Sequence, residues 1–200
     1  MPSSKRSRRR PEVTALKAAS RGRVRVDLDG APWRTVPPEV VLAAGLHVGL
    51  RLERPHLRTL RRELRSREAL AKASRLIARR DLSEAGLREE LRRRRVAPAA
   101  EGETVSKLVA AGAVDDERLA FRRAEFLTER GAGDLMVRAD LESRGIAPTV
   151  IERAVEALPR EHERARGIVE SRGPGPATAR YLARKGFGDD VLELAWDGAV

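Results

Sequence analysis

Leu182-Ala183-Arg184-Lys185-Gly186-Phe187 is the last of three copies of one short unit in this chain of 200 residues. Each copy ends a helix-forming stretch with a Leu, a short cluster that contains basic residues, and one apolar residue at a constant distance from the Leu. The first two copies start 50 residues apart and the third starts 41 residues later; the earlier two read Leu91-Arg92-Arg93-Arg94-Arg95-Val96 and Leu141-Glu142-Ser143-Arg144-Gly145-Ile146. Repeats of this length are typical of small helical modules stacked in series, which present an extended surface instead of one deep pocket. The pattern therefore favours binding of a long partner over catalysis.

The composition suits thin helical modules. Hydrophobic residues make up 41% of the chain, but aromatic residues only 3% and charged residues 36%, so Leu, Val and Ala have to form the core. The chain contains no Cys, which excludes disulfides, thiolate metal sites and cysteine nucleophiles and is compatible with a reducing cytoplasm. No apolar run approaches the roughly 20 residues that span a bilayer, and the basic N-terminus lacks the apolar segment of a secretory signal. We expect a cytoplasmic protein with no membrane partner.

The net charge of +11 is unevenly distributed along the chain. Residues 51–95 contain 16 basic and 7 acidic residues, a balance of +9, whereas residues 96–200 contain 15 basic and 19 acidic residues, a balance of −4. This asymmetry favours contact between the first half and a polyanion, or a protein carried on a polyanion, with the acidic half facing protein. The alternative is that the charge serves solubility alone.

The first quarter of the chain predicts a disordered tail followed by a small β-rich module. Residues 1–12 form a basic tail with almost nothing to bury, and the module covers residues 13–55. Alternation over residues 24–28, then Asp29-Gly30, predicts a hairpin in which Val26 faces Trp33. Pro38 begins a short helix that Gly45 stops, and alternation over residues 48–52 predicts a third strand.

From residue 56 onward the apolar spacing is helical and predicts three tandem three-helix repeats. A linking helix and the first repeat cover residues 56–112, and the second and third repeats cover 113–158 and 159–200. Ser83 and the acidic run Asp115-Asp116-Glu117 mark helix starts, and Gly145 marks a helix end. Residues 97–102 are interpreted as an insertion between two helices. The predicted fold class is thus mainly α, an elongated curved array of repeats preceded by the β-rich module.

Several of these stretches, in their order and spacing, resemble the RecX family, bacterial regulators of the RecA recombinase. The resemblance covers nearly all of residues 13–197. The stretches that carry it are Arg79-Arg80-Asp81-Leu82-Ser83-Glu84-Ala85-Gly86-Leu87, Gly112-Ala113-Val114-Asp115-Asp116-Glu117-Arg118-Leu119-Ala120, Arg130-Gly131-Ala132-Gly133 with Leu141 and Arg144-Gly145-Ile146, and Tyr181-Leu182-Ala183-Arg184-Lys185-Gly186-Phe187. The chain departs from the pattern at Arg95, which stands where the other copies have Gly, at Leu119, where the family usually has an aromatic residue, and near residues 101–103, where it carries an insertion.

The resemblance implies a regulator of homologous recombination and DNA repair, connected with the SOS response and without enzymatic activity or cofactor. Members of the family bind along the recombinase filament on single-stranded DNA and lower its ATPase and strand-exchange activity. It implies the RecA filament as partner, and DNA either directly or through the filament. We expect the chain to act as a monomer.

Two arginine clusters are the candidate recombinase- or DNA-binding residues. The first lies on the linking helix, where Arg58 with Arg62 and Arg61 with Arg65 are one turn apart; its members are Arg58, Arg61, Arg62 and Arg65. The second is the run Arg92, Arg93, Arg94 and Arg95, which points in four directions around a helix. That run has two interpretations: favourable interaction with a helix C-terminus, or contact with phosphates or the filament.

No catalytic or metal-binding pattern is visible. His47, His56 and His162 are scattered without ligand spacing, and the segment 173–176 is glycine-rich but contains prolines and lacks the Lys of a phosphate-binding loop. Aromatic residues for base stacking are nearly absent, and no helix-turn-helix with a base-reading face is apparent. The leading hypothesis is a non-enzymatic regulator of the RecA filament. The alternatives are a helical protein that binds DNA or RNA directly and without sequence preference, and a structural adaptor.

Overall fold

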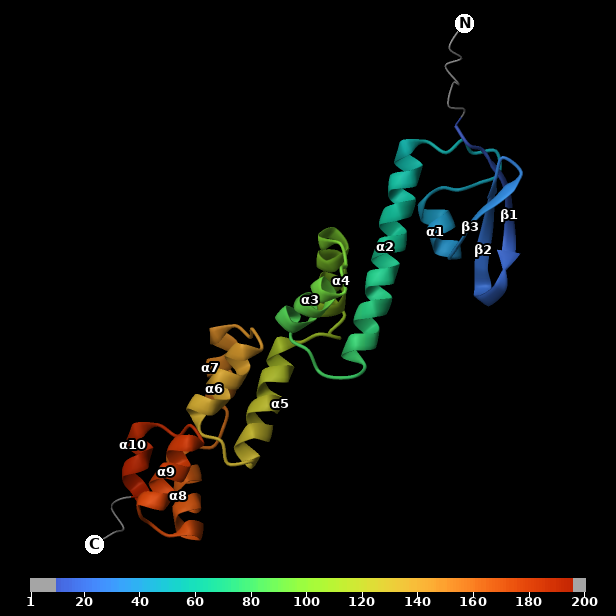
Figure 1. The fold of residues 1–200 in the computed structure, drawn as a ribbon. Coiled ribbons are helices and arrows are strands. Elements are labelled where there is room, and N and C mark those ends of the chain that lie inside the picture. The colour runs from blue at the N-terminus through green and yellow to red at the C-terminus, as the bar shows by residue number, and fades with distance from the viewer. Residues whose placement is uncertain (1–9, 196–200) are drawn as a thin grey trace, which may run out of the picture. The chain divides into compact units, whose positions relative to one another are not determined.

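The computed structural model describes residues 10–195, which form a three-stranded sheet followed by ten α-helices (Figure 1). The mainly helical fold class with a small β-rich N-terminal module is thereby confirmed. The chain divides into two compact units. One takes in the residues up to Lys72 together with Val96–Thr104, and the other takes in Ala73–Arg95 together with the residues from Val105 onward.

The first unit is built on the antiparallel sheet β1-β2-β3, formed by Val13–Ala19, Arg23–Leu28 and Ala31–Val36. The predicted hairpin is present, and Asp29 and Gly30 both have the positive φ that its turn requires (50° and 82°). The predicted pairing of Val26 with Trp33 is wrong, because a register shift after Val26 places it opposite Arg34 and leaves Trp33 39% exposed.

The third strand was predicted in the wrong place. Residues 48–52 form no strand: they contribute an isolated bridge between Arg51 and Glu12 and a few backbone hydrogen bonds beside it, and Val48 is 60% exposed. The third strand is instead β1, whose short 3-10 connection to β2, η1 (Ser20–Gly22), is closed by Arg21 and Gly22 with positive φ. Strand β1 pairs with β2 over six residue pairs. This pairing connects two separate stretches of the chain, and the alternation of residues within either stretch does not reveal it.

The ordered chain also begins earlier than predicted. Most of the predicted tail, residues 1–9, lies outside the described residues. The backbone oxygen of Pro11 accepts a hydrogen bond from Leu52 (2.8 Å), and the backbone N–H of Glu12 donates to Asp29 (3.0 Å). Pro11 and Glu12 therefore belong to the folded module and not to the tail.

A short helix and the start of a long one complete the core of the first unit. Helix α1 (Pro38–Ala43) ends before Gly45, as predicted, and Gly45 has a φ of 60°. Helix α2 (Arg54–Ile77) packs Leu60, 1% exposed, against the sheet and α1. The apolar stripe of α2 thus faces the core, and its arginines face outward.

The remaining helices follow in series: α3 (Glu84–Arg93), α4 (Pro98–Ala110), α5 (Asp116–Glu129), α6 (Asp134–Ser143), α7 (Pro148–Glu156), α8 (Glu161–Arg172), α9 (Pro176–Arg184) and α10 (Asp189–Leu192), with a 3-10 turn η2 (Glu193–Ala195). Ser83 caps α3 and Asp115 caps α5, both as predicted. The predicted insertion at residues 97–102 is wrong: α4 begins at Pro98 and buries Ala100, because helical pairing continues through Gly102.

The three repeat copies have the same local structure. Their leading residues, Leu91, Leu141 and Leu182, are completely buried. Gly145 and Gly186 take left-handed φ values of 72° and 77°. Arg95 takes a φ of 54°, so the first copy ends in the same way without glycine. The predicted repeat boundaries, at residues 112 and 158, fall between helices and stay a prediction; residues 196–200 lie outside the described chain.

Candidate functional site

Four arginines of the first predicted cluster line one groove in the first unit. These arginines project from the outer face of α2, and the start of α4 forms the opposite wall. The groove has a volume of about 310 Å³ and is lined by Arg58, Arg61, Arg62, Arg65, Ala97, Ala99, Ala100 and Glu103. Sequence reasoning identified its arginines but not the small-residue wall, because it assigned that wall to an insertion.

Most of the positive charge of this groove is unpaired. Arg58, Arg61 and Arg65 are exposed and have no ion pair with any residue that the structure describes. Arg62 contacts the neighbouring Glu63 (Nη2 to Oε1, 3.2 Å), a surface pair that is worth little in water. Three guanidinium groups on successive turns of one helix therefore remain available to an anionic partner.

The second predicted cluster is largely neutralised by acidic residues one turn earlier. Arg93 donates from Nε to Oε1 of Glu89 (3.1 Å), and Arg92 is 3.9 Å from the same carboxylate. Arg94 is hydrogen bonded to the Glu90 carboxylate, which lowers the pKa of Glu90, and also donates to the Glu90 carbonyl (3.0 Å). This cluster belongs to the second unit, whereas the arginines of α2 belong to the first. Of the two interpretations, the contacts favour stabilisation of the helix C-terminus.

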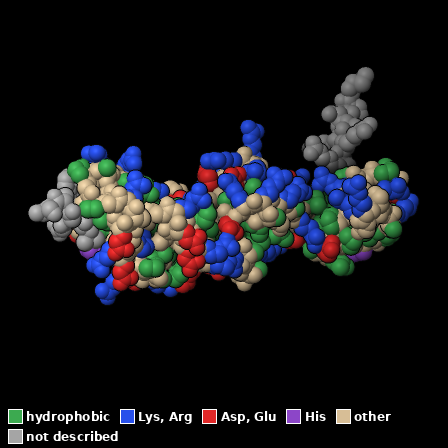
Figure 2. All heavy atoms as spheres, turned by 90° about the horizontal axis from the view of Figure 1, so that it is seen from below, with side chains coloured by type: hydrophobic (Ala, Val, Ile, Leu, Met, Phe, Trp, Pro, Cys, Tyr) green, Lys and Arg blue, Asp and Glu red, His purple; other side chains and the backbone are tan. Residues whose placement is uncertain are grey.

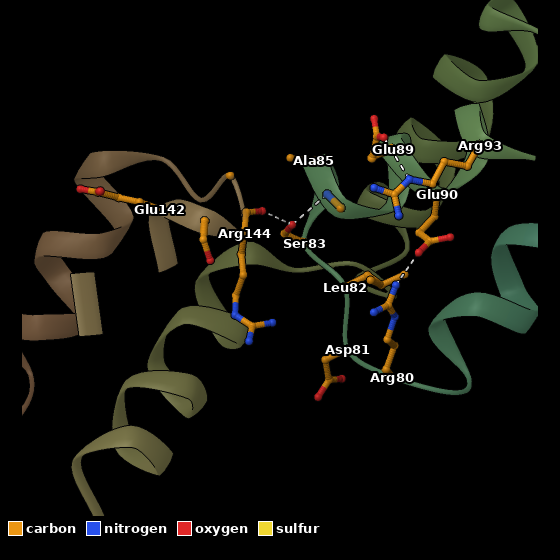
Figure 3. A pocket seen from close by; sticks show the side chains of 13 residues that line it. Arg80, Asp81, Leu82, Ser83, Ala85, Glu89, Glu90, Arg93, Glu142 and Arg144 are labelled. Carbon is orange, nitrogen blue, oxygen red and sulfur yellow. Dashed lines mark hydrogen bonds and ion pairs between the residues drawn. The ribbon is translucent and has the colours of Figure 1, made fainter. Parts of the chain in front are cut away.

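The N-terminus of α3 meets the C-terminus of α6 beside a cavity of about 410 Å³ (Figure 3). The Ser83 hydroxyl accepts from the Gly86 backbone N–H (3.0 Å) and donates to the Arg144 carbonyl (2.5 Å). Four of the charged side chains around the cavity are paired within its lining: Arg80 with Glu90, and Arg93 with Glu89. The hydrogen bond from Ser83 to Arg144 joins two repeats beside it.

A second joint of the same kind connects α6 and α9. The Gly133 backbone N–H donates to the Lys185 carbonyl (2.8 Å), and the Leu135 N–H donates to the Gly186 carbonyl (3.0 Å). The middle helices α3, α6 and α9 are therefore connected head to tail: a donor at the start of one helix, the Ser83 hydroxyl at α3 and backbone N–H groups at α6, meets carbonyls at the end of the next. Sequence reasoning interpreted Gly133 only as a break in the chain and did not identify the joint.

Ion pairs between helices neutralise much of the second unit. Asp140 accepts from Nε (2.9 Å) and Nη2 (2.8 Å) of Arg123 and from Nε of Arg144 (2.7 Å). The hydrogen bonds from Arg123, followed by those from Arg144, hold the pKa of Asp140 well below its usual range. Figure 2 shows the consequence on one face: acidic side chains lie among the basic ones and do not form a separate region.

The described residues contain no group of three His, Asp or Glu side chains that could hold a metal ion. His162 is 3.8 Å from Asp190, an exposed contact on the surface of the third repeat. Within the part of the chain that the structure covers, no helix is long and apolar enough to cross a bilayer.

No family model matches the chain. It is 33% identical over 152 residues to the regulatory protein RecX of Deinococcus radiodurans, with 71% of each chain covered. It is 31% identical over 145 residues to the regulatory protein RecX of Stenotrophomonas maltophilia, which covers 68% of this chain and 89% of that protein.

Two solved structures share the fold. A crystal structure of regulatory protein RecX matches with a TM-score of 0.76 at 18% identity, over 92% of this chain and 98% of the other. The crystal structure of RecX from Lactobacillus salivarius matches with a TM-score of 0.57 at 14% identity, over 66% and 94%.

Proposed function

The chain belongs to the RecX family of regulatory proteins, and on this basis we propose that it binds the RecA recombinase filament on single-stranded DNA. Binding lowers the ATPase and strand-exchange activity of the filament, so the protein restrains homologous recombination and DNA repair without catalysing a reaction itself. It acts in the cytoplasm, as a monomer, and needs no cofactor.

The unpaired arginines of the α2 groove are the observation that best supports this proposal. Arg58, Arg61 and Arg65 present three permanent positive charges that form no ion pair with a described carboxylate, although Glu103 lines the same groove. A nucleoprotein filament offers two kinds of anion, DNA phosphates and acidic side chains of the recombinase, and a guanidinium group can bind either one bidentately. The groove therefore suits a filament, whether its contact is with DNA or with protein.

A charge-matched pair of variants tests the proposal. The groove variant carries Arg58→Gln, Arg61→Gln and Arg65→Gln. The control carries Arg160→Gln, Arg166→Gln and Arg180→Gln, which removes three exposed arginines of the third repeat that have no ion pair among the described residues. Both lose three positive charges, so only the position of the loss differs.

The assay is RecA ATPase and strand exchange on single-stranded DNA with increasing amounts of each protein. Wild-type and control proteins should inhibit at similar concentrations, whereas the groove variant should need at least tenfold more. Undiminished inhibition by the groove variant would exclude the groove as the binding surface, and absence of inhibition by the wild type would exclude the proposed function.

The charge balance of +9 over residues 51–95 supports the alternative, direct nucleic-acid binding without recombinase. Titration of labelled single-stranded DNA with the protein alone separates the two functions. If the groove binds phosphates, the groove variant should lower the slope of log K against log salt by about 2, roughly 0.7 per cation.

A further inference from the structure

Two aromatic residues of the second unit, one exposed and one half-buried, each have cations beside the ring. The Phe126 ring, at the end of α5, is 44% exposed, and the Arg123 and Arg130 guanidinium carbons each lie 5.2 Å from its centroid. Tyr181, on α9, is half-buried and has the Arg172 guanidinium carbon 4.2 Å from its centroid. Sequence reasoning missed these rings as a site, because they are 55 residues apart and the surrounding sequence is net acidic.

Lys185 connects the two rings. Its Nζ donates to the Arg130 carbonyl (3.0 Å) and lies 5.9 Å from the centroid of Tyr181. The residues therefore form one continuous series of contacts across the joint between the second and third repeats. We call it the aromatic strip, defined as Phe126, Arg130, Lys185, Tyr181 and Arg172.

The cations of the strip differ from their neighbours in having no carboxylate partner. Arg118, Arg122 and Arg123, earlier on α5, are each within ion-pair distance of an Asp. Arg130, Lys185 and Arg172 have no ion pair with any residue between 10 and 195. Positive charge thus persists along the strip, although residues 96–200 are net acidic.

We propose that the aromatic strip is a binding site for single-stranded nucleic acid. Along the strip, the Phe126 ring is followed by two cations, then by the Tyr181 ring and a third cation. This alternation of rings and cations matches the alternation of bases and phosphates along a single strand. Bases stack on aromatic rings and on guanidinium planes whatever their identity, and cations between the rings hold the backbone. Duplex DNA does not fit this order, because its bases are stacked inside the helix.

A protein partner would be expected to use the strip differently. Tyr and Arg also anchor protein interfaces, but there they cluster around a desolvated centre. Here the rings are separated by charged groups, and each ring has a cation within 6 Å of its centroid, an arrangement that suits a partner with evenly spaced anions. The strip lies in the acidic half, which the charge balance predicts to face protein, and the proposal gives this half a nucleic-acid contact in addition.

Fluorescence anisotropy of a labelled oligothymidylate, with the full-length protein and no recombinase, tests the strip. The ring variant carries Phe126→Leu and Tyr181→Leu, which removes both stacking surfaces and keeps every charge. The control carries Trp33→Leu, since Trp33 is another exposed aromatic residue with a cation, Arg34, 5.8 Å from its ring centroid, in the first unit. Circular dichroism and the urea midpoint verify that all variants are folded.

We expect the ring variant to bind the oligonucleotide about tenfold more weakly for each ring that stacks on a base, and the control to bind like the wild type. A second variant, Arg130→Gln with Arg172→Gln, should lower the slope of log K against log salt by about 1.4. Ultraviolet crosslinking of an oligonucleotide that contains 5-iodouracil should label Phe126 or Tyr181.

Equal affinity of the ring variant and the control would overturn the inference, as would crosslinks confined to α2 and α4. If the ring variant keeps its affinity for the oligonucleotide but loses inhibition of the RecA filament, the strip is a protein contact and the nucleic-acid assignment is wrong. Because the binding assay contains no recombinase, its failure is distinct from a failure of the proposed regulation.

Discussion

Gly133 should be the most sensitive small residue of the joint between α6 and α9. A Cβ atom at this position would lie 2.3 Å from the Gly186 carbonyl oxygen and 2.4 Å from the Phe187 nitrogen, far inside contact distance and against backbone that cannot rotate away. The backbone of Gly133 has a φ of −83° and a ψ of 171°, which alanine adopts without strain. The effect of Gly133→Ala therefore isolates the close approach of the two helices.

The expected loss follows from the contacts that the added methyl group separates. Two hydrogen bonds cross the joint, from Gly133 to Lys185 and from Leu135 to Gly186. Losing them should cost about 1–3 kcal/mol in total, and crowding adds about 1–3 kcal/mol. We expect the free energy of unfolding of the third repeat to fall by roughly 2–6 kcal/mol as the joint opens.

The matched control is Gly167→Ala in α8, where a Cβ atom would meet nothing within 4 Å. The same substitution there should stabilise the helix by about 0.5–1 kcal/mol. Hydrogen exchange resolves the effect locally. The backbone amides of residues 133 and 135 should exchange at least tenfold faster in Gly133→Ala than in the wild type, and their exchange rates should be unchanged in the control. Unaltered exchange, with a urea midpoint as high as that of Gly167→Ala, would refute the role of the joint.

Three further predictions concern single residues. Arg95→Gly should raise the free energy of unfolding by about 1 kcal/mol, because glycine takes the left-handed φ of 54° without strain; a lower urea midpoint would mean that the Arg95 side chain makes a compensating contact. Ser83→Ala should lower the free energy of unfolding by about 1–2 kcal/mol, because the substitution removes a helix cap and leaves the Arg144 carbonyl without its hydroxyl donor. The control is Ser106→Ala on the exposed face of α4, and equal urea midpoints of the two variants would contradict the prediction. The depressed pKa of Asp140 means that the folded state binds fewer protons than the unfolded chain below roughly pH 4, so stability should fall as the pH decreases through this range. Urea midpoints measured against pH should fall less steeply for Asp140→Asn, and parallel curves would disprove the assignment.

Local signals accounted for most of the helices. Ser83 and Asp115 cap helices in the structure as their side chains predict, and Gly145 ends one with the expected positive φ. A helix is predictable in this way because its hydrogen bonds connect residues four apart. The residues that determine its start, its buried face and its end therefore lie within a few turns of one another. The constant distance from Leu to the apolar residue likewise predicted the repeat, and all three leucines are buried.

Long-range pairing accounted for what was predicted wrongly. Strand β1 has no clear alternation of its own and is defined by its pairing with β2. Residues 48–52 alternate but pair only with the start of β1, through one bridge and the hydrogen bonds beside it. The insertion at residues 97–102 was misassigned because the continuity of α4 depends on burial of Ala100, which the local composition does not show.

Chain chemistry alone established the helical repeat, the absence of cysteine chemistry and the surplus of arginine between residues 51 and 95, since all three depend on residue type and short spacing. Which arginines are available for binding could be settled only by folding. In the sequence, the four arginines 92–95 are as good candidates for binding as those of α2. In the structure, Glu89 and Glu90 form ion pairs with three of them, whereas Arg58, Arg61 and Arg65 have no ion pair among the described residues. Phe126 and Tyr181 likewise became one strip through Arg130 and Lys185. The physical reason is that availability of a charge or a ring depends on its neighbours in space, and those neighbours are brought together by packing between repeats.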